Sequence, residues 1–200
     1  MLERIKEIRA SERRFYQKIT DIYSQCSYDY KQDSEVTDNF FKTVQNKLLF
    51  AITGRTAPEL ISGRADSAKP NMGLQTWKNA PDGKILQSDV TVSKDYLTQN
   101  ELSGLNDIVS MYLDYAENQA KRHRLLSMVE WVSRLDAFLQ FNEYDLLHNT
   151  GAVERKIADE LAKEEFKKYR VIQDEQYMSD FDKSTQKYLT DKENTRASGL

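Results

Sequence analysis

Hydrophobic residues recur at alternating three- and four-residue steps along most of the chain, which is the spacing of amphipathic α-helices. The narrowest stripe lies in residues 2–26 and consists of Ile5, Ile8, Phe15, Ile19, Ile22 and Cys26. A stripe of this width is typical of a helix that presents one seam to a partner helix. We therefore expect a long first helix through which two copies of the chain associate.

Residues with capping preferences mark where the next helices begin. Ser34 precedes an apolar-periodic segment that extends to about Thr53, and Gly54 follows it as a helix stop. A Ser or Thr followed three residues later by Glu forms a capping box, a signature of a helix N-terminus. Three such boxes occur, at 56–59, 98–101 and 127–130. They predict helices that end near residues 64, 124 and 142.

The last helix is expected to begin at Thr150, and its apolar positions are diluted by charge. The positions expected to face the core are Val153, Ile157, Leu161, Phe166 and Tyr169. Residues 190–200 are polar and aperiodic, so we expect a disordered tail after a single domain that spans residues 1–189.

The segment between the first and second capping boxes lacks a helical period. Residues 81–84, Pro-Asp-Gly-Lys, form a turn signature that could fold residues 77–80 against 85–90 as a small hairpin. Low glycine and proline content, with 7 Gly and 3 Pro in 200 residues, favours helix over a β-sandwich. We predict an all-α fold: an irregular bundle of about five to six helices around a central irregular loop or small hairpin.

The central loop, residues 64–77, is the candidate binding site of the sequence. Five of its residues are candidates for contact with a ligand or partner: Arg64, Asp66, Lys69, Asn71 and Trp77. Arg64 and Asp66 could pair across a turn, Lys69 offers a mobile cation, and Asn71 could hold a left-handed backbone that exposes amides to an anion. In the alternative interpretation the loop is structural, and its apolar residues anchor it on the bundle.

Composition limits the other chemistry that the chain can perform. The single cysteine, Cys26, falls on an apolar stripe, and His123 and His148 have no cysteine partners for a zinc site. We assign no catalytic residues, no metal and no cofactor.

Charge and hydropathy indicate the compartment and the partners. The net charge is -3, so contact with nucleic acid would depend on local basic clusters such as residues 121–124. No apolar run approaches the roughly 20 residues that a membrane-spanning helix needs. One cysteine and the lack of a signal-peptide pattern point to the cytoplasm.

Several long stretches resemble one protein family. They are residues 7–23, 43–47, 64–74, 111–117 and 135–145, and their amino-acid sequences are similar to those of the virulence-associated RhuM family. The resemblance implies a bacterial genomic-island or mobile-element setting. Members typically carry an additional N-terminal region that resembles a regulatory DNA-binding module, so we expect this chain to correspond to the C-terminal domain alone. Members often have histidines where this chain has Leu48 and Thr53, which lowers the weight of an enzymatic function.

Two functions remain open. The first is a non-enzymatic interaction and oligomerisation domain of a mobile-element or virulence-associated protein, possibly regulatory and DNA-associated or defensive. The alternative is an effector enzyme or toxin that acts on nucleotides or nucleic acid through the central loop. The absence of a recognisable catalytic set favours the first.

Overall fold

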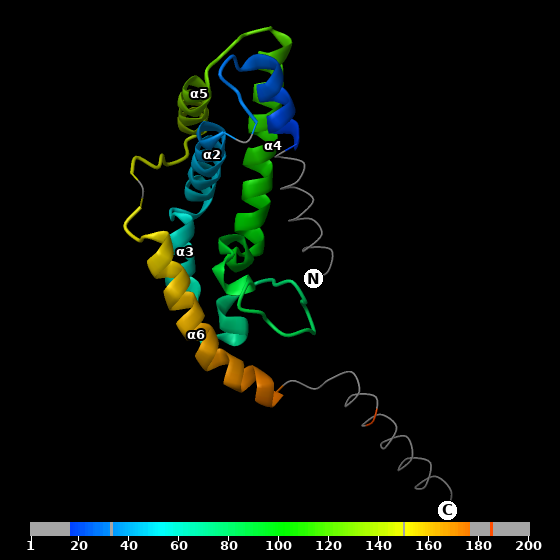
Figure 1. Cartoon of the computed structure of the whole chain (residues 1–200), viewed down its shortest axis with the longest axis vertical. Coiled ribbons are helices and arrows are strands. Elements are labelled where there is room, and N and C mark those ends of the chain that lie inside the picture. Colours follow the sequence, from blue (N-terminus) through cyan, green and yellow to red (C-terminus); the bar gives the residue numbers. More distant parts are fainter. Residues whose placement is uncertain (1–16, 33, 150, 177–184, 186–200) are drawn as a thin grey trace, which may run out of the picture.

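The computed structural model describes residues 17–32, 34–149, 151–176 and 185 (Figure 1). The described chain is built from helices and contains no β-strand, which confirms the all-α prediction. The elements are α2 (Glu35–Thr53), α3 (Ala57–Arg64), α4 (Gln99–Lys121), α5 (Met128–Phe141) and α6 (Arg155–Gln176), with short 3-10 turns η1 (Pro70–Gly73), η2 (Asp89–Thr91) and η3 (Ser93–Tyr96). Residues 17–26 are also helical. None of the described helices combines the length and the apolar content needed to cross a bilayer.

The predicted caps are present. Ser34 accepts a hydrogen bond from the Thr37 amide, and Gly54 ends α2 with a left-handed φ of 65°. All three capping boxes form with both of their hydrogen bonds, at the starts of α3, α4 and α5. Local sequence therefore determines where these helices begin. The predicted tail at residues 190–200 lies outside the described residues.

One hydrophobic core fills the bundle formed by residues 17–26, α2, α4 and α5. Trp131 and Tyr23 are fully buried in it, and their rings lie 5.0 Å apart. Ile19, Ile22 and Cys26, the described part of the predicted first-helix seam, are buried in this same core. These three side chains therefore pack within the chain itself. Ile5, Ile8 and Phe15 lie outside the described residues.

A second core lies below the bundle in Figure 1, between α3, the irregular segment 65–96 and α6. The face of α6 that packs here carries Ala158, Ala162 and Phe166, and the predicted Val153 and Tyr169 also pack against this core. The prediction was wrong for Ile157 and Leu161, which are 56% and 40% exposed. Small alanine side chains let α6 lie close to α3. The close approach of the two helices, and not the spacing of the larger hydrophobic residues, therefore decides which α6 residues are buried here.

The two cores meet at α3 and at the end of η3. Leu60 belongs to the bundle core, whereas its neighbour Ile61 belongs to the second core. Tyr96 and Leu97 divide in the same way. Successive residues point to opposite sides, so these two short segments hold the two cores together.

The hairpin prediction was wrong, because the chain around Gly83 makes a turn without a ladder. The Gly83 amide donates to the Asn79 carbonyl over 2.8 Å, and the Trp77 indole donates to the Gly83 carbonyl over 2.7 Å. Ile85 does not pair with residues 77–80. Its backbone amide donates to Gln173 Oε1 on α6, and its carbonyl accepts a hydrogen bond from Gln173 Nε2. Tertiary contact with α6 thus satisfies the groups that a hairpin would have paired.

Candidate functional site

Arg64 at the end of α3 pairs with α4, not with its neighbour in the loop. Its guanidinium makes a two-pronged contact with Glu101, with 2.7 Å between Nη1 and Oε2, and also donates to the Tyr96 carbonyl over 2.6 Å. The predicted pair with Asp66 was therefore wrong. The two parallel N–H donors of the guanidinium match the two oxygens of the Glu101 carboxylate. The expected contact with Asp66 across one turn does not provide this arrangement.

Glu101 is held in its charged form by this contact. The hydrogen bonds from Arg64 lower the pKa of Glu101 to about 2, and the Thr98 amide of the capping box adds to the effect. The side chains of Arg64 and Glu101 are only 24% and 19% exposed, so solvent screens the pair weakly. The pair joins α3 to the first turn of α4.

Asp66 and Lys69 lie at the surface of the central loop and contact each other. Lys69 Nζ lies 3.6 Å from Asp66 Oδ2, and the side chains are 51% and 41% exposed. The other Asp66 oxygen accepts the Ala68 amide over 2.9 Å. The two charges therefore stabilise the shape of the loop, although an exposed pair of this kind contributes little energy.

Asn71 adopts the predicted left-handed backbone, with φ 53° and ψ 30°, and Met72 follows with φ 58°. The nearby amides do not face an open site, however. The Met72 amide donates to the Lys69 carbonyl over 3.0 Å, and the Leu74 amide donates to the Asn71 carbonyl over 2.9 Å. These amides are occupied within the turn, so they do not form the anion nest that the sequence suggested.

Trp77 is 5% exposed and lies in the second core with Met72 and Leu74. The loop thus turns its apolar residues inward and neutralises its charges locally. None of the five predicted residues lines the cavity described next.

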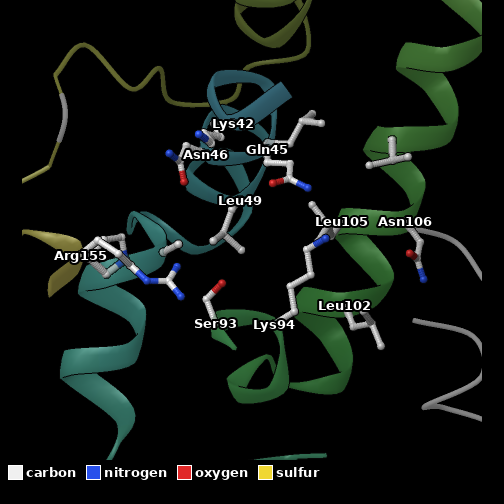
Figure 2. A pocket seen from close by; sticks show the side chains of 14 residues that line it. Lys42, Gln45, Asn46, Leu49, Ser93, Lys94, Leu102, Leu105, Asn106 and Arg155 are labelled. Atoms are coloured by element: carbon white, nitrogen blue, oxygen red, sulfur yellow. The ribbon is translucent and has the colours of Figure 1, made fainter. Parts of the chain in front are cut away.

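A cavity of about 420 Å³ opens where the two cores meet, between α2, α3, α4 and η3 (Figure 2). Its apolar lining comes mainly from the bundle core and the start of α3: Leu48, Leu49, Ala57, Pro58, Leu102, Leu105 and Val109. Its polar lining consists of Lys42, Gln45, Asn46, Ser93, Lys94, Asn106 and Arg155. A mostly apolar hollow with a few converging polar groups is the usual form of a ligand site.

The elements around the cavity aim polar side chains at it from several sides. Figure 2 shows Lys42, Gln45 and Asn46 on α2 facing Ser93 and Lys94 on η3 across the opening, with Asn106 on α4. Leu49 projects into the space between them. The polar groups therefore surround an apolar interior.

Most of these polar side chains have no partner among the described residues. Within the described residues, no hydrogen bond or ion pair involves the side chains of Lys42, Gln45, Asn46, Ser93 or Asn106. Their surroundings contrast with those of the central loop, where the charged groups are paired. These side chains are available to a ligand without loss of a contact in the fold.

Arg155 is a different kind of lining residue, because the structure fixes it. Its Nε donates to Asp159 over 2.8 Å and its Nη2 donates to the Thr91 carbonyl over 2.7 Å. Arg155 thus ties the start of α6 to η2 while its guanidinium reaches toward the cavity (Figure 2).

Sequence reasoning missed this cavity. Lys42, Gln45, Asn46 and Leu49 have the i, i+3, i+4, i+7 spacing of one helical face, which was a detectable signal for one wall. Nothing in that spacing indicates that Asn106 lies opposite. The site depends on convergence of residues from distant positions.

A second hollow, of about 660 Å³, lies beside Cys26, and two of the polar groups that line it, Lys121 and Glu117, pair with each other over 3.0 Å. The Cys26 thiol donates to the Ile22 carbonyl over 2.6 Å, and burial raises its pKa. A thiol with a raised pKa is a poor nucleophile. Among the described residues, no group of three or more His, Cys, Asp or Glu side chains could hold a metal ion.

Comparison with known proteins places the chain in a family. No curated protein and no solved structure matches it. A family model described as the Virulence protein RhuM family matches residues 1–178 of the 200. Because this match covers most of the sequence, the chain belongs to the Virulence protein RhuM family.

Proposed function

We propose that the chain is a non-enzymatic interaction domain whose recognition site is the cavity between α2, α3, α4 and η3. It would serve a bacterial mobile-element or virulence-associated protein with a regulatory or defence role. Family membership supports the setting, and the cavity supports the recognition role.

The observation that carries this proposal is the set of unpartnered polar side chains around an apolar interior. Polar side chains that are not used by the fold can exchange water for a ligand at low cost, because no internal hydrogen bond is broken. Apolar surface in the same hollow supplies the favourable burial term. The apolar surface would therefore supply affinity, and the polar side chains would orient the ligand.

The lining favours binding over a reaction. Of the residues that line the cavity, none supplies a thiol, an imidazole or a carboxylate, so the lining contains neither a Cys–His nor a Ser–His pair. In the central loop, Arg64 is already neutralised by Glu101, which weighs against an effector that acts on phosphate groups there. The geometry offers no observation that favours the enzymatic alternative.

Self-association through the first helix stays a prediction, and the described residues limit which part of that helix could form the interface. Because Ile19, Ile22 and Cys26 pack into the chain's own core, an interface on this helix would use the stripe before residue 17. Light scattering at rising protein concentration checks this. A dimer is expected, and a monomer that persists at about 100 μM would contradict it.

The recognition role is tested by fragment mapping with amide NMR spectra. A library of small neutral, anionic and cationic fragments is titrated into the ¹⁵N-labelled protein. We expect the shifts to cluster at the backbone amides of Gln45, Leu49 and Asn106. An Asn106→Trp variant, which fills the cavity from α4, should abolish them. Shifts scattered over the surface, or unchanged in the filled variant, would contradict the proposal.

A further inference from the structure

We infer that the cavity binds a small organic anion, in which one carboxylate-like group is attached to an apolar body. This inference rests on the proposed function, because it assigns a ligand chemistry to the same cavity. Size, the sign of the charge and the placement of the donors each contribute to it.

The size of the cavity suits a small molecule. Its 420 Å³ falls in the range of about 300–1,000 Å³ that ligand sites occupy. This volume equals that of roughly 14 water molecules at about 30 Å³ each. A ligand of on the order of fifteen non-hydrogen atoms would fill it.

The interior requires an apolar body. Leu48, Leu49, Leu102 and Leu105 are buried or nearly so and line the cavity directly. A fully polar ligand would lose its hydration against these side chains without replacing it. The greater part of the ligand surface is therefore hydrocarbon.

The charge of the lining has one sign. Lys42, Lys94 and Arg155 line the cavity from three different elements, and none of the residues that line it is acidic. Asp159, which contacts Arg155, lies outside the lining. Asp159 balances Arg155, whereas Lys42 has no carboxylate partner among the described residues, so this lining repels a cationic ligand and attracts an anion.

The uncharged polar groups of the lining supply further hydrogen-bond donors. The amide nitrogens of Gln45, Asn46 and Asn106 and the hydroxyl of Ser93 are all hydrogen-bond donors. Lys42 and Asn46 lie together on α2, opposite Ser93 (Figure 2). A neutral hydrocarbon would leave these donors without an acceptor, whereas an anionic group would accept hydrogen bonds from them.

Two fluorescent probes of similar shape test the inference. 1-Anilinonaphthalene-8-sulfonate carries one negative charge, and N-phenyl-1-naphthylamine is the same ring system without it. We expect the wild-type protein to bind the sulfonate at least about fivefold more tightly than the neutral compound, since one charge-assisted contact is worth roughly this factor or more. An excess of decanoate should displace the sulfonate, whereas decanol should not.

Variants identify the cavity as the place of binding. Lys42→Gln should weaken the sulfonate about five- to tenfold and change the neutral probe by less than twofold. Asn106→Trp and, independently, Ala57→Trp should abolish binding of both probes, with folding checked by thermal melting. Lys78→Gln, at an exposed lysine outside the lining, should change neither.

The outcomes separate this inference from the proposed function. Equal affinity for the two probes, or equal weakening of both by Lys42→Gln, would overturn the anion preference while fragment mapping still supports a recognition site. Unchanged probe binding in both tryptophan variants, or no displacement by decanoate, would also overturn it. Failure of every fragment to shift the cavity amides would remove the recognition site as well.

Discussion

The central loop and the cavity contain similar residue types but use them in opposite ways. In the loop, Arg64 pairs with Glu101, Lys69 pairs with Asp66, and the Trp77 indole donates to Gly83. At the cavity, Lys42 and Asn46 have no such partner among the described residues. The charges of the loop are thus taken up by the fold, whereas the cavity holds the unpaired polar groups on which the proposed recognition site depends.

The difference teaches that the polar residues of a loop can serve the fold itself, through a neighbour in the case of Lys69 and through a distant helix in the case of Arg64. A loop that must cross between two cores needs internal pairs to satisfy its charges and amides. Residues that meet only in space have no such local task. Substitutions in the loop should therefore reduce stability, whereas substitutions of cavity polar groups should leave it unchanged.

The largest effect is expected at Trp77. Trp77→Ala removes a ring that is 5% exposed from the second core and leaves the Gly83 carbonyl without its donor. We expect a loss of about 3–5 kcal/mol in the free energy of unfolding, measured by urea denaturation. Phe141→Ala, at a ring that is 86% exposed, is the control and should change it by less than about 0.5 kcal/mol. A loss below about 1 kcal/mol at Trp77 would show that the loop is not anchored there.

Gly73 should give the next largest loss. Its φ is 81°, and a Cβ would lie 2.3 Å from the Arg64 carbonyl oxygen, so Gly73→Ala combines backbone strain with a clash. A loss of about 2–4 kcal/mol is expected. The matched change Gly104→Ala lies within α4, where the nearest atom is Ile52 Cδ1 at 3.4 Å, and should stabilise by about 0.5–1 kcal/mol. If both variants changed stability in the same direction, the close approach at Gly73 would be refuted.

Glu101→Gln should cost about 1–3 kcal/mol at neutral pH. Glutamine keeps the capping box but leaves Arg64, which is largely buried, without its counter-charge. The comparison variant is Glu164→Gln, whose partner Lys167 and own side chain are both about two-thirds exposed, and it should cost less than about 0.5 kcal/mol. Equal costs would mean that solvent screens both pairs alike.

The same pair predicts how stability depends on pH. The pKa of Glu101 is lowered to about 2 in the folded chain, against about 4.3 for an unperturbed glutamate. Between these values the unfolded chain binds more protons, so stability rises with pH. The contribution is complete above about pH 5 and is lost as the pH falls toward 2. The stability difference between wild type and Glu101→Gln should shrink over that interval, and a constant difference would contradict the assignment.

The smallest effect is expected at the cavity. Asn46→Ala and Asn106→Ala remove amides that have no hydrogen bond with the described residues, so the free energy of unfolding should change by less than about 0.5 kcal/mol. Denaturation together with the sulfonate titration measures both consequences, since probe affinity should fall while stability holds. A loss above about 1 kcal/mol would show that these amides serve the fold.

Much of the helical architecture could be predicted because its signals are local. Thr98 and Glu101 are three residues apart, and their capping box forms as the sequence indicates. Gly54 likewise ends α2 by its own left-handed conformation. These interactions act within one or two helical turns, so the order of residues suffices to reveal them.

The sequence was less informative where several helices compete for the same contact. Ile157 and Leu161 looked like core positions of α6, yet the close approach of α6 to α3 selects Ala158 and Ala162 instead. Ile85 looked like part of a hairpin but pairs with Gln173. In both cases the deciding atoms belong to a segment far away in the sequence.

By itself, the order of amino acids determined the helices, their caps and the family to which the chain belongs. Only the tertiary structure decided that Arg64 meets Glu101 and that Asn46 and Ser93 lie on opposite sides of one cavity (Figure 2). The physical reason is range: caps and periodicity depend on neighbours along the backbone, whereas charge pairing and cavity formation depend on how two cores are brought together.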